Sequence, residues 1–172
     1  MRSYVVAVST LLLFCSTFAV AQDVAKPQYS LKEENPQIGS LIRRDQVSGS
    51  LIALNLPYAK LPPQDKLVLH SWWESIPPND EPPFPAGGMS VLLDPLRKVH
   101  AAILKPGDLF VVATVGKDGK VLEARVIEEP SREMGAFAAR LMLLTSFKPA
   151  VCSGQPCSMQ FPLRMKFTVS SW

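Results

Sequence analysis

Proline dominates the middle of the chain and limits the regular structure that can form there. Nine of the 16 prolines lie between residues 57 and 95. Proline fixes φ and has no N–H, so this density excludes long helices and central strands and favours extended chain. Only residues 64–76 are free of proline for long enough to form a short helix. We therefore expect part of residues 57–95 to act as a stiff linker before a folded domain at residues 95–172.

A helix is predicted at the start of that domain. Asp94 and Pro95 form an N-cap and first-turn pair, and Pro106 and Gly107 end the pattern. No acidic residue accompanies His100 at helical spacing, so we interpret it as a packed or half-exposed histidine rather than a catalytic one. The residues between these limits that form the helical stripe are Leu96, Val99, His100, Ile103 and Leu104.

Two strands and a second helix follow. A β-branched run at 109–115 and an alternating segment at 121–127 flank an Asp-Gly pair at 118–119, which is a strong hairpin signal. After Ser131, apolar and small side chains recur with helical spacing, and we predict that this face packs on the hairpin. The residues of that face are Met134, Phe137, Ala138, Leu141, Met142 and Thr145.

In the last segment, large apolar side chains alternate strictly with other side chains, and we predict a strand from Gln160 to Val169. Pro162 cannot donate to a ladder, which places it at a sheet edge or a strand start. The side chains of Arg164, Lys166 and Thr168 should face water or a partner, which makes this strand a candidate peptide-binding edge. The buried set is Phe161, Leu163, Met165 and Phe167. The order strand-strand-helix-strand predicts an α+β domain with one helix packed on a small antiparallel sheet.

The N-terminus predicts export. Arg2, an apolar stretch and the small residues Ala19 and Ala21 have the arrangement of a signal peptide covering residues 1–21. The alternative is an uncleaved anchor, because 18 uncharged residues from Tyr4 to Ala21 could just cross a bilayer. Residues 22–56 fit neither helical nor strand periodicity and carry little information. We expect a periplasmic protein that contacts the membrane only if the leader is retained.

The cysteine count supports this compartment. Cleavage removes Cys15 and leaves Cys152 and Cys157, which an oxidising compartment should join in a disulfide. A zinc site would need four ligands, and both histidines lie far upstream without finger-like spacing. Four intervening residues also differ from the two-residue redox spacing. We expect no metal.

The search for other chemistry finds no catalytic constellation. The formal net charge is only +3, which gives no electrostatic basis for nucleic-acid binding. The sequence has no nucleophile elbow and no phosphate-binding glycine loop, so we expect a binding protein without a cofactor rather than an enzyme. Trp72 and Trp73 beside His70 and Glu74 invite interpretation as an aromatic ligand platform, but we favour a role for the indoles in the core.

Residues 107–170 resemble the TonB C-terminal domain family. The hairpin "VGKDGKVLEARVIEEP", the helix "GAFAARLMLL" and the closing strand "FPLRMKF" occur in the family's order. The most specific piece comprises Phe147, Pro149 and Ala150, followed by Gly154 in a turn. In physical terms, Phe147 caps the helix against the sheet, Pro149 keeps the crossover extended, and Gly154 allows positive φ.

The resemblance implies a periplasmic module that binds partner peptides by strand pairing, which in TonB itself involves an outer-membrane transporter. This sequence departs from full TonB because residues 1–22 contain no histidine and have the features of a cleavable leader. Residues 57–95 also lack the family's alternation of proline with Glu or Lys. We therefore expect a periplasmic binding or envelope-accessory protein. The alternative is a genuine energy transducer anchored in the inner membrane.

Overall fold

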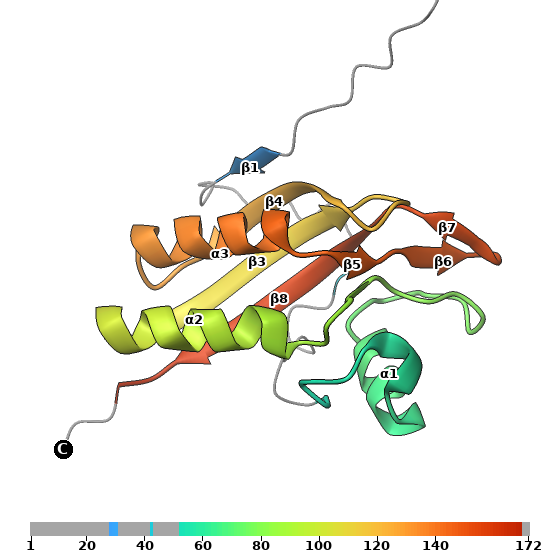
Figure 1. Ribbon diagram of the computed structural model, residues 1–172, viewed down its shortest axis with the longest axis horizontal. Helices are drawn as coiled ribbons and strands as arrows, with labels where there is room; N and C mark the ends of the chain where they lie inside the picture. Colours follow the sequence, from blue (N-terminus) through green and yellow to red (C-terminus); the bar gives the residue numbers. More distant parts are fainter. Residues whose placement is uncertain (1–27, 31–41, 43–51, 170–172) are drawn as a thin grey trace, which may run out of the picture.

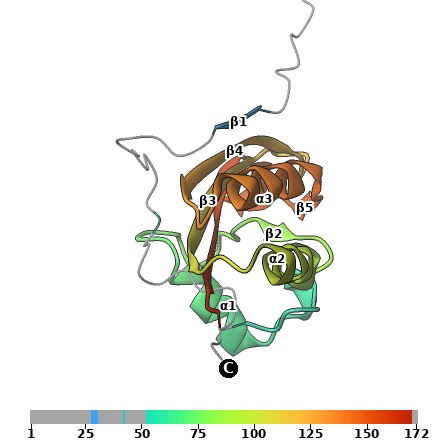
Figure 2. The same ribbon diagram turned by 90° about the vertical axis from the view of Figure 1, so that its left-hand side faces the viewer.

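The computed structural model describes residues 28–30, 42 and 52–169, and it has an α+β architecture. A four-stranded sheet has the order β1-β4-β3-β8. Two helices, α2 (Ser90–Ile103) and α3 (Arg132–Leu144), cover one face of it, as Figures 1 and 2 show. The strands are β1 (Gln28–Ser30), β3 (Gly107–Val115), β4 (Val121–Glu128) and β8 (Met159–Phe167). The fold class is therefore as expected, but the sheet carries two helices and one parallel strand rather than a single helix on an antiparallel sheet.

The hairpin of β3 and β4 forms as the sequence predicts. The two strands pair antiparallel, and Gly119 has φ 79° in the connecting turn. Positive φ is readily available only to glycine, which explains the Asp-Gly pair at this point. The Gly119 carbonyl also accepts the N–H of Phe147 at 2.9 Å. This bond fastens the turn to the segment that follows α3.

Helix α3 begins directly after Ser131, as the helical pattern in the sequence predicts. The Ser131 side chain accepts the N–H of Met134 at 3.3 Å, which satisfies one of the free donors at the helix start. Met134, Ala138 and Met142 are fully buried, as their spacing predicts. Thr145 instead ends the helix with extended backbone, and its hydroxyl donates to the Leu141 carbonyl at 2.7 Å.

Helix α2 differs from the prediction at both ends. It begins at Ser90 rather than Asp94, because Leu92 and Leu93 are buried and the Ser90 N–H donates to the Leu54 carbonyl at 2.6 Å. Pro95 consequently lies inside the helix. At the other end Leu104 is the C-cap, with left-handed φ of 53° and a 59% exposed side chain, so it does not join the apolar stripe.

The proline-rich segment is largely part of the core rather than a linker. It forms a short 3-10 helix η1 (Tyr58–Lys60), helix α1 (Pro63–His70) and strand β2 (Phe84–Pro85), which pairs with β5 (Phe147–Lys148). Helix α1 ends six residues before the predicted limit of 76. The buried aromatic, leucine and methionine side chains of this segment before α2 are Tyr58, Leu61, Leu69, Trp72, Trp73, Phe84 and Met89. Burial of apolar side chains therefore holds extended and short helical segments in the core, and proline is compatible with both kinds of segment.

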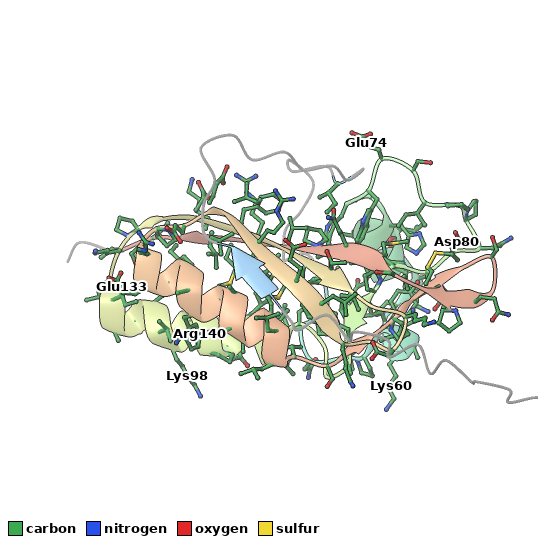
Figure 3. All side chains as sticks on the ribbon, turned by 90° about the horizontal axis from the view of Figure 1, so that it is seen from above. Lys60, Glu74, Asp80, Lys98, Glu133 and Arg140 are labelled. Atoms are coloured by element: carbon green, nitrogen blue, oxygen red, sulfur yellow. A yellow bond between two sulfur atoms is a disulfide. The ribbon has the colours of Figure 1, made fainter. Side chains whose placement is uncertain are left out.

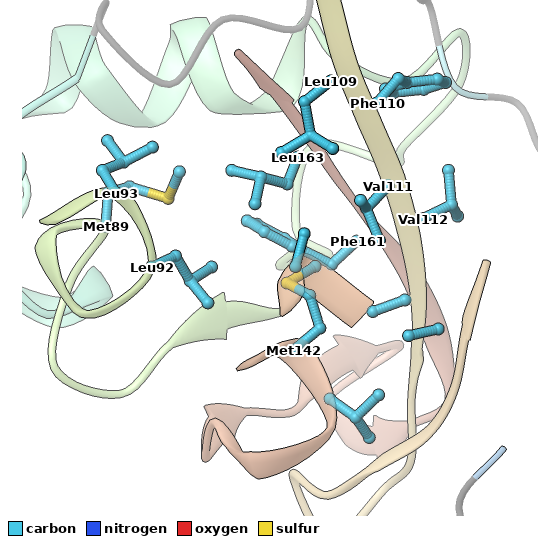
Figure 4. Close-up of a cluster of buried hydrophobic side chains, with 14 of the residues drawn as sticks. Met89, Leu92, Leu93, Leu109, Phe110, Val111, Val112, Met142, Phe161 and Leu163 are labelled. Atoms are coloured by element: carbon cyan, nitrogen blue, oxygen red, sulfur yellow. The ribbon is translucent and has the colours of Figure 1, made fainter. Parts of the chain in front are cut away.

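Both faces of β3 are buried. Leu109 and Val111 face the helices with Phe161, Leu163 and Met142, whereas Phe110 and Val112 lie on the other side of the strand (Figure 4). Met89, Leu92 and Leu93 bring α2 into the same cluster. A strand buried on two sides is expected to be apolar throughout, which explains the continuous run in β3.

A small disulfide-bonded hairpin precedes β8. Strands β6 (Ala150–Cys152) and β7 (Gln155–Cys157) pair antiparallel, and Cys152 is bonded to Cys157 with a Cα–Cα separation of 5.8 Å. Gly154 has φ 80° in the turn, as predicted, and Ser153 before it also has positive φ. The cysteine pair expected from the sequence is thus present.

Loss of this disulfide should have a small effect on stability. The loop that it closes is short, so replacement of both cysteines by alanine should lower the unfolding free energy by about 2 kcal/mol or less. Urea unfolding of the double variant and the parent chain measures this difference. Equal counts of reactive thiols in the unfolded parent before and after reduction would show that the bond does not form in the protein.

Within the described part of the chain, no helix combines the length and the apolar character needed to span a bilayer. The leader predicted at 1–21, and the possible anchor, lie outside the described residues.

Candidate functional site

Strand β8 forms one border of the main sheet. It pairs antiparallel with β3, and no described strand pairs with its other side. The opposite border is different, because β1 pairs parallel with the outer side of β4. The N-terminal strand therefore extends the β4 side, and β8 remains the outer strand at which the predicted edge lies.

The register shows which backbone groups of β8 point outward. In an antiparallel ladder, residue pairs alternate between those that exchange both hydrogen bonds and those that exchange none. Pro162 pairs with Val112 and has no N–H, so this pair belongs to the second kind. Arg164 and Lys166 lie two and four residues after Pro162, and the pairing of β8 with β3 has no register shift. Their pairs with β3 are therefore of the same kind as that of Pro162. Their N–H and C=O groups consequently point away from β3.

Accessibility varies along the strand. Residues 159–160 are half-buried, 161–163 are buried, Arg164 and Met165 are half-buried, Lys166 is exposed, and Phe167 is buried again. Thr168 is also exposed but lies just beyond the end of β8, which is shorter than the predicted Gln160–Val169. The exposed residues at this edge are therefore Lys166 and Thr168.

The two charged side chains of the edge have different surroundings. The Arg164 guanidinium lies 3.4 Å from a Glu128 carboxylate oxygen and 5.8 Å from the centre of the Phe110 ring. Lys166 has no ion pair with any residue in the described ranges. Arg164 is thus held against the sheet, and Lys166 is the exposed charge beside the outward backbone groups.

At the C-terminal end of β8, His100 of α2 packs against the strand. Its ring stacks on Phe167 with 4.4 Å between ring centres, and its Nε2 lies 3.2 Å from the Lys105 carbonyl oxygen. This packing agrees with the structural role inferred from the sequence. His100 closes one end of the helix–sheet interface.

The predicted motif residues gather elsewhere. The Phe147 ring packs edge-on against Phe161 with centres 5.2 Å apart, and Ala150 is fully buried. Pro149 lies between β5 and β6, and Gly154 lies at the tip of the disulfide hairpin. These four residues shape the crossover into β8 and do not join Arg164, Lys166 and Thr168 at the open edge.

The tryptophans do not form a ligand platform. Trp72 is fully buried and Trp73 is 6% exposed, with their rings stacked 6.2 Å apart between centres. Trp72 also contacts Phe161 at 6.2 Å. Glu74, by contrast, is exposed and points into solvent (Figure 3). The core interpretation of the indoles is confirmed.

A pocket near these residues was not predicted from the sequence. It has a volume of about 450 Å³ and lies between Tyr58 with α1 on one side and residues 78–81 on the other. The α1 residues Lys66, Leu67 and His70 line it. Figure 3 shows Asp80 beside the disulfide hairpin, where its Oδ1 accepts the Ser153 N–H at 2.8 Å.

The side chains of Tyr58 and His70 contact each other in this pocket. The Tyr58 hydroxyl lies 3.2 Å from His70 Nε2. Burial, aided by the nearby Glu81 carboxylate, raises the pKa of Tyr58 to about 12. Burial lowers the pKa of the His70 imidazole, which Glu81 opposes and the ammonium groups of Lys148 and Lys66 reinforce. Both groups are therefore neutral at neutral pH.

His70 should make the stability of the domain depend on pH. Its pKa in the folded chain lies below the ordinary value of 6.5, so the unfolded state takes up a proton first as the pH falls. The unfolding free energy should then decrease below about pH 6.5, and His70→Gln should reduce that decrease. Urea unfolding at about pH 7.5 and about pH 5.5 measures it. An equal decrease in parent and variant would contradict the assignment.

The sequence offered only a partial signal for this pocket. His70 lies in the sequence window around the two tryptophans, but its partners come from separate proline-rich turns. Tyr58 lies 12 residues before it, and residues 78–81 follow directly after Pro77. Contacts of this kind carry no fixed spacing, so periodicity cannot reveal them.

No protein-family model matches the chain, and no curated protein matches it.

Proposed function

We propose that the chain is a periplasmic binding protein whose C-terminal domain takes up an extended partner peptide as an added strand along β8. The observation that carries this proposal is the sheet order, in which β8 is an outer strand while β1 extends the opposite border. Main-chain pairing with an outer strand is a recognised way of binding peptides. The outward N–H of Lys166 supplies a donor.

The resemblance to the TonB C-terminal domain family supports the same proposal. Residues 90–167 contain a helix, a hairpin, a second helix and a closing strand, in the order in which the resembling motifs occur. The motif residues Phe147, Pro149, Ala150 and Gly154 form the crossover that places β8 next to β3. A partner presented by an outer-membrane transporter fits this proposal, and neither a metal nor a cofactor is part of it.

A photo-crosslinking residue at Thr168 tests the proposal in cells. Thr168 is exposed and lies at the open end of the edge, so a bound strand should be captured there. The same residue introduced at Arg140, an exposed position on α3, is the matched control. A partner captured only from Thr168, and lost when Lys166→Pro is added, supports strand addition. Capture that is equal from both positions would contradict it.

The leader decides between a secreted module and an anchored transducer. We expect export with cleavage after Ala21, because small residues at 19 and 21 follow an apolar stretch. The intact mass of the protein from its native compartment measures this. A chain that still begins at Met1 or Arg2 in the membrane fraction would favour the energy transducer.

A further inference from the structure

The pocket between α1 and residues 78–81 is a separate feature from the β8 edge. Its volume of about 450 Å³ lies within the range of small-molecule sites in proteins. None of its lining residues belongs to β8 or to the crossover before it. Whatever binds here is therefore recognised by α1, Tyr58 and the loop at 78–81.

Most charges around the pocket are already used by the fold. Glu81 forms an ion pair of 2.9 Å with the Lys148 ammonium, which also donates to the Pro149 carbonyl at 2.9 Å. Asp80 accepts the N–H of Ser153. The backbone of Glu81 exchanges two hydrogen bonds with Val151. These bonds fasten residues 80–81 to the disulfide hairpin and make that wall of the pocket rigid.

The ammonium group of Lys66 is not used in this way. Its ammonium lies 4.8 Å from the centre of the Tyr58 ring, and it has no carboxylate partner among the residues that the structure describes. It is only half-exposed, so water compensates its charge incompletely. Since Lys148 offsets Glu81, Lys66 is the lining charge left to attract an anion.

His70 adds a second donor. The Tyr58 hydroxyl lies 3.2 Å from His70 Nε2 and either atom can donate in this contact. In the tautomer in which the Tyr58 hydroxyl donates, the imidazole proton lies on Nδ1, where it is available to an acceptor. The α1 side of the pocket thus combines an ammonium and an imidazole N–H one helical turn apart.

The rim beside these donors is apolar. Leu67 is 70% exposed and lines the pocket, so its side chain offers apolar surface to a ligand. Pro78 also lines the pocket. We propose that this pocket binds a carboxylate carried on a small aliphatic body, with the carboxylate at Lys66 and His70 and the aliphatic part against Leu67 and Pro78.

The position of Asp80 is consistent with this orientation. Its carboxylate belongs to the wall opposite α1 and would repel an anion placed there. The bound carboxylate must therefore lie on the α1 side. A ligand recognised by Asp80 instead would have to be a cation, and a neutral or cationic probe tests that outcome.

Matched probes separate these chemistries. N-acetyl-leucine carries the carboxylate and an isobutyl group, N-acetyl-leucinamide lacks only the charge, and leucinamide replaces it by an ammonium at the other end. Titration of the full chain, followed by amide NMR shifts, should show saturable binding of N-acetyl-leucine at residues 58, 66–70 and 79–81. Equal or stronger binding of either amide would overturn the proposal, as would the absence of saturable binding by the acid.

Variants locate the site. Lys66→Gln and Lys66→Met should weaken N-acetyl-leucine binding about tenfold or more, because a charge-assisted hydrogen bond is lost. Lys60→Gln is the matched control, since Lys60 is exposed and does not line the pocket. Affinities of both Lys66 variants within twofold of the parent, with circular dichroism unchanged, would overturn the assignment. A further titration with 4-methylpentanoate distinguishes the source, because equal affinity indicates a free aliphatic acid and tighter binding of N-acetyl-leucine indicates a peptide C-terminus.

Discussion

Lys166→Pro should weaken the affinity of the chain for its partner peptide by roughly 10- to 100-fold. The substitution removes an outward N–H and leaves a carbonyl of the added strand without its donor, which costs about 1–3 kcal/mol. Proline is tolerated at a position whose N–H points away from β3, because Pro162 already occupies such a position in β8. The fold should therefore be retained. Titration of the purified variant with the captured peptide measures the effect.

Two control variants separate the backbone from the side chain. Lys166→Ala removes the charge but keeps the N–H, so it should bind almost as tightly as the parent. Met165→Pro has the opposite parity, and it should destabilise the domain because the Met165 N–H bonds to Leu109 in β3. If Lys166→Pro and Lys166→Ala weaken binding equally, the side chain rather than the backbone recognises the partner.

Phe161→Ala should cause the largest loss of stability, about 3–5 kcal/mol. Phe161 is fully buried on β8 and contacts three aromatic rings, those of Trp72, Phe84 and Phe147. It thus joins the proline-rich segment to the sheet, and its removal leaves a cavity shared by both. Urea unfolding measures the loss.

Leu122→Ala is the matched control for Phe161→Ala. Leu122 lies on β4 and is 43% exposed, so truncation should change the unfolding free energy by only about 0.5–1 kcal/mol. Similar losses in the two variants would contradict the placement of Phe161 at the centre of the core. An early separate transition in Phe161→Ala would show that the proline-rich segment detaches first.

The C-terminal part of the fold could be predicted because its signals are local. The Asp-Gly turn, the Ser131 cap and the alternation around Phe161 each depend on neighbouring residues, and the structure contains the corresponding turn, helix and strand. The start of α2 could not be predicted in this way. It is fixed by burial of Leu92 and Leu93 and by a bond to Leu54, which is distant in sequence. A strong local cap at Asp94 is overridden by these contacts.

Of the two candidate sites, the β8 edge could be predicted from the sequence and the pocket could not. Alternation and Pro162 were sufficient to propose an outer strand, and the register then shows which N–H groups point outward. The pocket depends on Tyr58, His70 and Glu81, which meet only after the proline-rich turns fold onto the disulfide hairpin. No spacing rule connects them. The prediction of a stiff linker within residues 57–95 is wrong for the same reason, because extended segments can pack into a core without periodicity.

Hydrogen exchange at the amides of β8 tests strand addition most directly. With the partner peptide bound, the amide of Lys166 should exchange at least tenfold more slowly, because it acquires a new acceptor. The amides of Leu163 and Met165 already bond to β3 and should change little. Slower exchange at Lys166 without a change at Met165 is the result that the account predicts. Binding that leaves the exchange of Lys166 unchanged would contradict it.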